Sequence, residues 1–273
     1  MTRPPLRSLD GYGGVLFDLD GTLYRGAQPL PGASDFVRAC RDAGLRVAFG
    51  TNNALLERET IAARLRDLGI EASADELVTA PDALASVLLR DGRTFVVRLG
   101  NAGLRESLDA AGLHGPDVMD ADPTSVDPRR TALAVGLDPE RSLAGIARAA
   151  AIVEAGAVVY ASAAEPHYPT DRGVEAGTGT MLAALNAMAP IAPELCGKPS
   201  RHFGERAATA LDTDRPVLVV GDSLPADVGV AREMGWDSLL LLTGAARERD
   251  VASDGPPSHV AADLLSVMRE LGS

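Results

Sequence analysis

The 273-residue sequence is poor in lysine, cysteine and aromatic side chains, and it contains no long apolar run. Aromatic residues make up 4% of the chain, so most of its core has to be built from Ala, Val and Leu. No apolar run approaches the roughly 20 residues of a membrane span. The first 14 residues hold two arginines but no apolar segment, and we therefore expect neither a signal peptide nor a membrane partner.

Positive charge is also scarce, since the formal net charge is -12. Such a surface repels the phosphates of nucleic acid, and no basic run offers a local exception, so we expect no nucleic-acid partner. The two cysteines, Cys40 and Cys196, form neither a disulfide framework nor a metal-ligand spacing. Together these absences predict a cytoplasmic protein.

Lysine occurs once, as Lys198 in the stretch CGKPS, whereas the other 25 of the 26 basic residues are arginine. A chain that uses arginine everywhere else has kept one compact ammonium group. Arginine and lysine differ in width, in hydrogen-bond geometry and in hydration. The exception therefore marks Lys198 as a candidate functional residue.

Apolar runs alternate with amphipathic patterns along most of the chain, which is typical of a parallel sheet with helices on both faces. The predicted strands are 14–17, 45–50, 94–100, 131–137, 157–162, 216–221 and 238–244. The predicted helices are 32–44, 56–69, 102–112, 142–156 and 225–235. These patterns predict a doubly wound α/β core, and the elements between 94 and 162 either extend its sheet or form a separate module.

Two aspartates end the first predicted strand, in the stretch VLFDLDGT. Side chains alternate along a strand, so Asp18 and Asp20 project to the same side. Neighbouring carboxylates are tolerable if a cation lies between them or if one of them holds a proton. An ordinary Asp-Gly turn is the alternative interpretation. An ionised carboxylate can act as a nucleophile, and a protonated one can donate to a leaving group, so the pattern favours catalysis.

This strand end resembles the first motif of the haloacid dehalogenase (HAD) superfamily. The later motifs follow in order: Thr51 in VAFGTNN ends a strand, Lys198 precedes a helix, and Asp222 and Asp227 lie in VVGDSLPAD. The segments TNNA, VGLD, PTDRG, GTGTM and LLTG narrow the resemblance to subfamily IIA, the group of NagD-like, p-nitrophenyl, phosphoglycolate and glycerol-phosphate phosphatases. It covers nearly the whole chain.

The resemblance implies a phosphoric monoester hydrolase that uses Mg²⁺. Its metal ligands would be Asp18, Asp222 and the backbone carbonyl of Asp20, and Asp227 would orient waters or Lys198. Oxygen ligands of this kind suit Mg²⁺. Lys198 would pair with the nucleophilic carboxylate and with the phosphate, at a point that an ammonium reaches and a wider guanidinium does not.

The resemblance also implies a two-step mechanism. Asp18 would attack phosphorus and form an aspartyl-phosphate, while Asp20 would protonate the leaving alkoxide and later take a proton from the hydrolytic water. In addition to Lys198, several groups would donate hydrogen bonds to the phosphate. They are the Thr51 hydroxyl, the backbone amides of Asn52 and Asn53, and the backbone at Gly21.

Motif spacing predicts where a second domain is inserted. The first two motifs lie 33 residues apart and the last two lie 24 apart, which suits one β-α-β step each, but 147 residues separate the second motif from the third. We therefore predict a HAD-like core from 1–79 and 179–273, with an α/β cap domain of the C2 type from 80–178.

A cap excludes water and contacts the leaving group, so it should determine the substrate. The loop SAAEPHYPTDRG resembles the substrate loop of the subfamily, but Ala163 and Glu165 stand where relatives commonly have Asn and Asp. The candidate contacts to the leaving group in this loop are His167, Tyr168 and Arg172.

The resulting hypothesis is a phosphatase for a small phosphorylated metabolite, of the sugar, polyol or glycolate phosphate type. Two alternatives stay open: a phosphotransferase or mutase on the same core, and a catalytically silent module that binds a phosphate ligand. The resemblance also leaves a homodimer open, since family members often dimerise through the cap.

Overall fold

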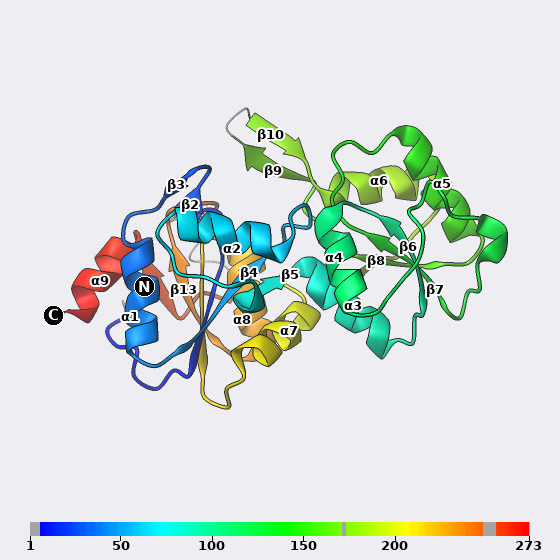
Figure 1. The fold of residues 1–273 in the computed structure, drawn as a ribbon. Coiled ribbons are helices and arrows are strands. Elements are labelled where there is room, and N and C mark those ends of the chain that lie inside the picture. The colour runs from blue at the N-terminus through cyan, green and yellow to red at the C-terminus, as the bar shows by residue number, and fades with distance from the viewer. Residues whose placement is uncertain (1–5, 171–172, 248–254, 273) are drawn as a thin grey trace. The chain divides into compact units, whose positions relative to one another are not determined.

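The computed structural model describes residues 6–170, 173–247 and 255–272, and the chain divides into two compact units (Figure 1). The core unit comprises 1–51, 58–78 and 198–273, and the inserted unit comprises 52–57 and 79–197. Over the described residues, no helix combines the length and the apolar character that a membrane crossing needs.

The core unit is built around a six-stranded sheet with the order β14-β13-β12-β1-β4-β5. Its strands are β1 (Gly14–Phe17), β4 (Arg46–Thr51), β5 (Leu77–Thr79), β12 (Val217–Gly221), β13 (Asp237–Leu241) and β14 (His259–Ala261). Its helices are α1 (Ala33–Asp42), α2 (Arg58–Asp67), η1 (Ala74–Glu76), α7 (Arg201–Leu211), η3 (Leu224–Val228), α8 (Gly229–Met234) and α9 (Leu264–Leu271). A short hairpin, β2 (Tyr24–Arg25) with β3 (Gln28–Pro29), follows β1.

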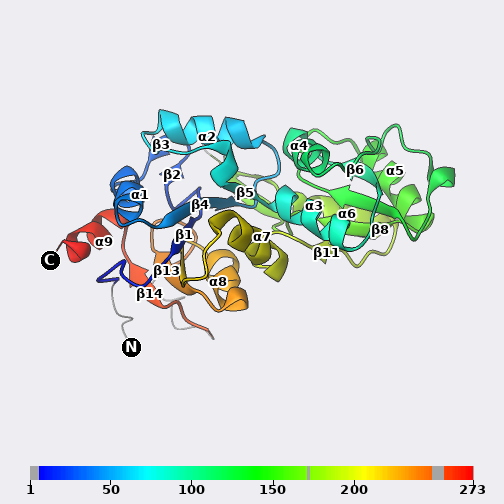
Figure 2. The same cartoon turned by 60° about the horizontal axis from the view of Figure 1, so that its bottom comes forward.

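Strand β1 lies at the centre of this sheet, parallel to β12 on one side and to β4 on the other (Figure 2). All four of its residues are buried, as are all five of β12, because helices cover both faces. On one face Phe17 packs against Phe36 of α1, with ring centroids 5.9 Å apart. On the other face Leu16 lies beside Gly50, and Phe203 of α7 packs there too. The predicted doubly wound core is confirmed.

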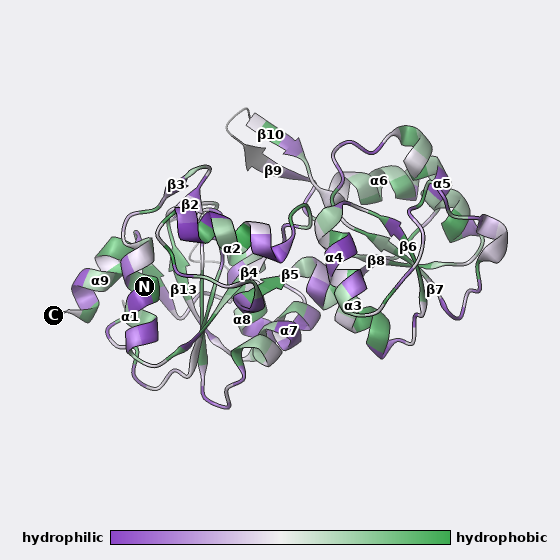
Figure 3. Cartoon of the chain, viewed as in Figure 1, coloured by the Kyte–Doolittle hydropathy of each residue, from purple (hydrophilic) through white to green (hydrophobic). Residues whose placement is uncertain are grey.

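The inserted unit has its own parallel sheet with the order β11-β8-β7-β6. Its strands are β6 (Phe95–Leu99), β7 (Thr131–Val135), β8 (Val158–Ala161) and β11 (Glu194–Leu195), with a separate hairpin of β9 (His167–Thr170) and β10 (Gly173–Ala176). Its helices are α3 (Ala80–Arg90), α4 (Ala102–Ala110), η2 (Pro123–Ser125), α5 (Leu143–Glu154) and α6 (Thr178–Met188). In both units, helices such as α2 and α5 carry hydrophilic and hydrophobic residues side by side (Figure 3).

The inserted unit extends further along the chain than the predicted boundary at 178/179. Leu182 and Leu185 of α6 are buried in one cluster with Ile146 of α5. Strand β11 pairs with β8, and Leu195 lies opposite Ala161. Because α6 buries its apolar side chains in this unit and β11 extends its sheet, the unit ends at Gly197.

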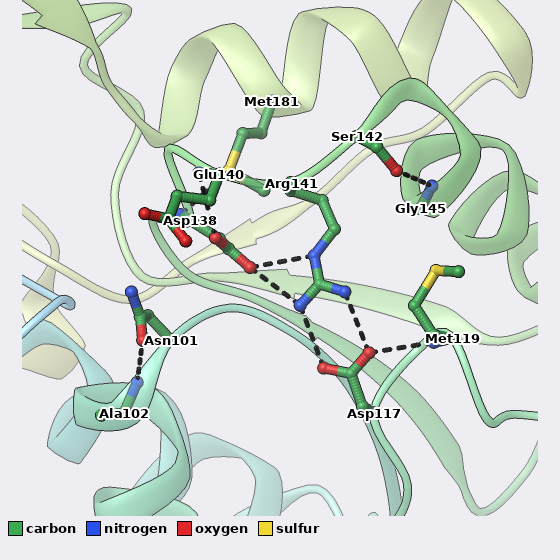
Figure 4. A network of polar contacts seen from close by, with 10 residues as sticks. All are labelled: Asn101, Ala102, Asp117, Met119, Asp138, Glu140, Arg141, Ser142, Gly145 and Met181. Carbon is green, nitrogen blue, oxygen red and sulfur yellow. Dashed lines mark hydrogen bonds and ion pairs between the residues drawn. The ribbon is translucent and has the colours of Figure 1, made fainter.

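A network of ion pairs joins the segment after α4 to the loop after β7 in the inserted unit (Figure 4). The Arg141 guanidinium donates to both carboxylate oxygens of Asp117, at 3.0 Å each, and to Asp138 at 2.9 Å. The Arg141 side chain is only 14% exposed, so the two carboxylates compensate a largely buried charge. These contacts hold two loop segments together, one with Asp117 and one with Asp138 and Arg141, beside a cavity of about 430 Å³.

Candidate active site

The two aspartates of the first motif lie in a tight turn at the carboxyl end of β1. The Asp18 amide still donates to Val220 of β12, at 2.8 Å, so the sheet fixes its position. The chain then turns back, and the Gly21 amide donates to the Tyr24 carbonyl at 2.8 Å. Gly21 has φ +90°, a conformation that favours glycine. The turn leaves Asp20 exposed, while Asp18 is largely buried.

Lys198 brings its ammonium group to this turn from the segment before α7. Its Nζ lies 2.5 Å from Oδ1 of Asp18, 2.7 Å from Oδ1 of Asp227 and 3.2 Å from the Gly50 carbonyl. An ammonium has three donors, and here three acceptors surround it. The side chain is 4% exposed, so little water reaches the charge. The one lysine of the sequence therefore lies among the acids of the first and fourth motifs.

Asp222 and Asp227 complete an acidic cluster at the end of β12. One carboxylate oxygen from each of Asp18, Asp222 and Asp227 lies within 4.8 Å of the others. The predicted helix 225–235 begins instead as a π-helical turn, in which the Val228 amide donates to the Ser223 carbonyl at 3.2 Å. This turn carries Asp227, and its Oδ2 accepts from the Ser223 amide at 3.0 Å.

The cluster holds more negative charge than the protein itself balances. Burial raises the pKa of Asp18 to about 8, with further contributions from Asp227 and Asp222, although Lys198 opposes the shift. Burial and Asp227 likewise raise the pKa of Asp222 to about 6. Burial disfavours the Lys198 ammonium, but Asp18 and Asp227 outweigh that effect and raise the pKa of Lys198. Three carboxylates therefore face one ammonium.

These residues fit a hard divalent cation. Converging carboxylate oxygens are the donors that Mg²⁺ and Ca²⁺ prefer, and the raised pKa values of Asp18 and Asp222 indicate charge that a cation would balance. Glycines also make room for the acids. A Cβ at Gly244 would lie 1.7 Å from Oδ2 of Asp222, and one at Gly221 would lie 2.2 Å from Asp227. Larger residues at either position would displace the cluster.

The predicted phosphate-binding residues divide between the two units. Thr51 is buried at the end of β4 in the core unit, next to the Gly50 carbonyl that accepts from Lys198. Asn52 and Asn53 belong to the inserted unit. There the Asn52 side chain donates to Glu165 at 2.7 Å, and Asn53 accepts from the Leu55 amide at 2.8 Å. Glu165 is one of the positions at which the sequence departs from its subfamily.

Two of the three predicted leaving-group contacts lie on the β9–β10 hairpin of the inserted unit. His167 is exposed, and the Tyr168 hydroxyl donates to Glu175 at 2.8 Å. Arg172 lies outside the described residues. The role of all three in substrate binding stays a prediction.

The residues after β13 contact the acidic turn and Asp222, although no role was predicted for them. The Ala245 amide donates to Oδ2 of Asp222 at 2.5 Å, and the Thr243 hydroxyl donates to the Gly21 carbonyl at 2.6 Å. The one available signal was the segment LLTG, whose glycine at 244 ends a buried strand.

Paired acids and a lysine at the strand ends of a doubly wound core, with a unit inserted between the second and third motifs, define a HAD-type hydrolase. Residues 15–114 match the family of haloacid dehalogenase-like hydrolases, and residues 195–267 match the HAD-hydrolase-like family. The chain is 32% identical to D-glycerol 3-phosphate phosphatase of Mycobacterium tuberculosis, over 94% of this chain and 71% of that one. It is 30% identical to acid sugar phosphatase of Staphylococcus saprophyticus, over 96% and 99% of the two chains.

A solved structure shares the same fold. The crystal structure of glycerol phosphate phosphatase from Mycobacterium tuberculosis in complex with magnesium superimposes with a TM-score of 0.84 at 32% identity, and the match covers 94% of this chain and 76% of that one. The chain therefore belongs to the haloacid dehalogenase-like hydrolases, in the NagD-like group of phosphatases. The predicted superfamily and the predicted subfamily are both confirmed. Phosphoric monoester hydrolysis, the predicted class of activity, is the class of both relatives.

Proposed function

We propose that this protein is a Mg²⁺-dependent phosphatase that hydrolyses a small phosphate monoester through an aspartyl-phosphate on Asp18. The observation that carries the proposal is the Lys198 ammonium, held between Asp18 and Asp227 in a cluster of three buried or nearly buried acids. A phosphate monoester carries about two negative charges at neutral pH, so a carboxylate can approach it only where positive charge is concentrated. The acidic cluster is suited to concentrate this positive charge, as the Lys198 ammonium and a bound cation.

Asp18 and Asp20 perform the two steps. In the first step a carboxylate oxygen of Asp18 bonds to phosphorus, the bond to the leaving alkoxide breaks, and Asp20 gives that alkoxide a proton. In the second step Asp20 takes a proton from water as the water oxygen bonds to phosphorus. The Asp18–phosphorus bond then breaks, which releases inorganic phosphate and restores the carboxylate. The exposure of Asp20 suits a group that meets both leaving group and water.

Lys198 and Thr51 hold the reactants in place. Lys198 fixes one oxygen of Asp18, and Thr51 offers a hydroxyl donor to the phosphate at the end of the neighbouring strand. Asp227 accepts a hydrogen bond from the Lys198 ammonium and so holds it beside Asp18. Asp18, Asp222 and the carbonyl of Asp20 would hold Mg²⁺. The ion would supply charge neutralisation for the carboxylate and the phosphate.

The proposed substrate is a sugar, polyol or glycolate phosphate. D-glycerol 3-phosphate and acid sugar phosphates, for which the two relatives are named, are small esters of this kind. In this proposal the inserted unit acts as the cap, and His167, Tyr168 and Arg172 contact the leaving group. A homodimer and a cytoplasmic location also stay proposals, and light scattering in solution would measure the oligomeric state.

A panel of phosphate esters tests this function, with inorganic phosphate release measured at several Mg²⁺ concentrations. We expect hydrolysis of at least one small polyol or sugar phosphate, and loss of at least about 10⁴-fold in Asp18→Asn. The exposed Asp42→Asn, at the end of α1, is the matched control and should keep full activity. No release from any ester would indicate a silent binding module. Transfer to added glycerol that exceeds hydrolysis would indicate a phosphotransferase.

A further inference from the structure

The loop that follows β13, residues 243–246, lies directly against the acidic cluster. The Ala245 amide donates to Oδ2 of Asp222, and the Ala246 amide donates to the Asp222 backbone carbonyl at 2.9 Å. One short loop thus binds both the side chain and the main chain of Asp222. Apart from the Thr243 hydroxyl, the loop carries no polar side-chain group, so its amides serve to place Asp222.

The carboxylate of Asp222 lies close to the backbones of two glycines. A Cβ at Gly244 would lie 1.7 Å from Oδ2 of Asp222, and a Cβ at Gly21 would lie 2.6 Å from the same oxygen. Both distances are shorter than any real side chain could accept. The backbone of the turn that carries Asp18 and Asp20, called the acid turn below, and the backbone of the loop therefore both lie close to Oδ2 of Asp222, which leaves its carboxylate little freedom to rotate.

This packing distinguishes the two oxygens of Asp222. Oδ2 already accepts from the Ala245 amide at 2.5 Å, which favours Oδ1 as the ligand oxygen. Asp222 would then donate one oxygen rather than two. A single oxygen per carboxylate suits the octahedral shell of Mg²⁺, whereas Ca²⁺ accepts both oxygens of a carboxylate readily.

Thr243 anchors the loop to the acid turn. Its hydroxyl donates to the Gly21 carbonyl at 2.6 Å, and its own carbonyl accepts from the Arg25 guanidinium of β2. Thr243 thereby fixes the turn that carries Asp20 to the loop that contacts Asp222, and its hydroxyl makes the contact closest to the acids. Loss of the hydroxyl would release the loop on the side where it meets the cluster.

We propose that Thr243 is a positioning residue for the metal site, which acts by holding the Ala245 amide on Asp222 and so leaves a single oxygen of Asp222 for the cation. The inference rests on the proposed function, because it assumes that the cluster binds a divalent metal. Groups that orient metal ligands typically change metal affinity by about 10- to 100-fold when they are removed.

Mn²⁺ binding to the metal-free, full-length protein tests the proposal without any substrate, with free Mn²⁺ measured by electron paramagnetic resonance. Thr243→Val removes the hydroxyl at nearly constant volume, and Thr243→Ser keeps it. We expect the dissociation constant to rise about 10-fold in the valine variant and to stay within about 2-fold in the serine variant. The melting temperature of the metal-free protein should be the same in both, since Thr243 is only partly buried.

Gly244→Ala provides a stronger perturbation at the same place, with an expected loss of about 100-fold in Mn²⁺ affinity. Equal Mn²⁺ affinity in Thr243→Val and the wild type would overturn the inference, and so would failure of the serine variant to restore it. If the wild type itself bound no Mn²⁺, the metal in the proposed function would be wrong instead. The two failures are therefore separable.

Discussion

At the scale of single residues, the sequence raises the question of why a chain with 25 arginines has a single lysine. The structure surrounds the Lys198 nitrogen with three acceptors, from Asp18, Asp227 and Gly50, all within 3.2 Å. A tetrahedral ammonium satisfies three acceptors around one point. A planar guanidinium spreads its donors over a wider fork and prefers a single bidentate partner.

Lys198→Arg should therefore be almost as inactive as Lys198→Met, although it keeps the positive charge. We expect both to lose about 10²- to 10³-fold in kcat/KM for the best ester of the panel, the scale of losing one preorganised donor. Arg201→Lys, an exposed change on α7, is the reference for the opposite exchange and should have no effect. Retention of a tenth or more of the activity by Lys198→Arg would show that charge alone suffices there.

The raised pKa of Asp18 predicts how stability of the metal-free protein depends on pH. A carboxyl whose pKa is about 8 in the fold and 3.8 otherwise binds its proton more tightly when folded, so unfolding becomes easier as pH rises between those values. Asp18→Asn removes this ionisation. In EDTA, urea unfolding should show the variant gaining stability relative to the wild type from pH 5 to pH 8, by at most about 1.4 kcal/mol per pH unit. A constant difference across this range would contradict a protonated Asp18.

At the scale of elements, the strand ends were predictable from sequence and the loop contacts were not. The apolar runs 14–17 and 216–221 each end in acids, and parallel strands bring their carboxyl ends to one edge, where β1 and β12 indeed lie side by side. The loop at 243–246 has no such signal. Its role depends on contacts with Gly21 and Asp222, which lie 222 and 23 residues away, and no local pattern encodes them.

The ion pairs of Arg141 with Asp117 and Asp138 are another feature that was not predicted from the sequence. Arg141→Met would leave Asp117 and Asp138 without their partner in a largely buried place, which should cost about 3 kcal/mol of unfolding free energy. Arg148→Met, at an exposed position of α5, the helix that follows Arg141, is the matched control and should change stability by less than about 0.5 kcal/mol. Denaturant titration measures both. Equal effects would mean that the network adds no stability.

At the scale of the whole molecule, the predicted cap domain and the compact inserted unit nearly coincide at one end and differ at the other. The predicted start at residue 80 lies one residue from the observed start at 79, because the long gap between motifs is visible in the sequence. The predicted end at 178 differs from the end of the compact unit at 197, because α6 follows the hairpin directly and only its burial against α5 assigns it to the inserted unit. The short segment 52–57 also belongs to that unit, and no change in amino-acid composition along the chain predicted this.

Division into two units predicts that a metal ion protects only one of them. Asp18, Lys198, Asp222 and Asp227 all belong to the core unit, and a ligand stabilises the state that binds it by about 2.7 kcal/mol at 100 times its Kd. Hydrogen exchange of the amides in β1 and β12 should therefore slow by up to about 100-fold in saturating Mg²⁺, while exchange in β6 and β7 stays unchanged.

Asp222→Asn is the control, because it should remove this protection without altering exchange in the inserted unit. Equal slowing in the strands of both units would show that they unfold together as a single cooperative block. The ion would then stabilise residues that make no contact with it, and the inference that the two units unfold independently would be wrong.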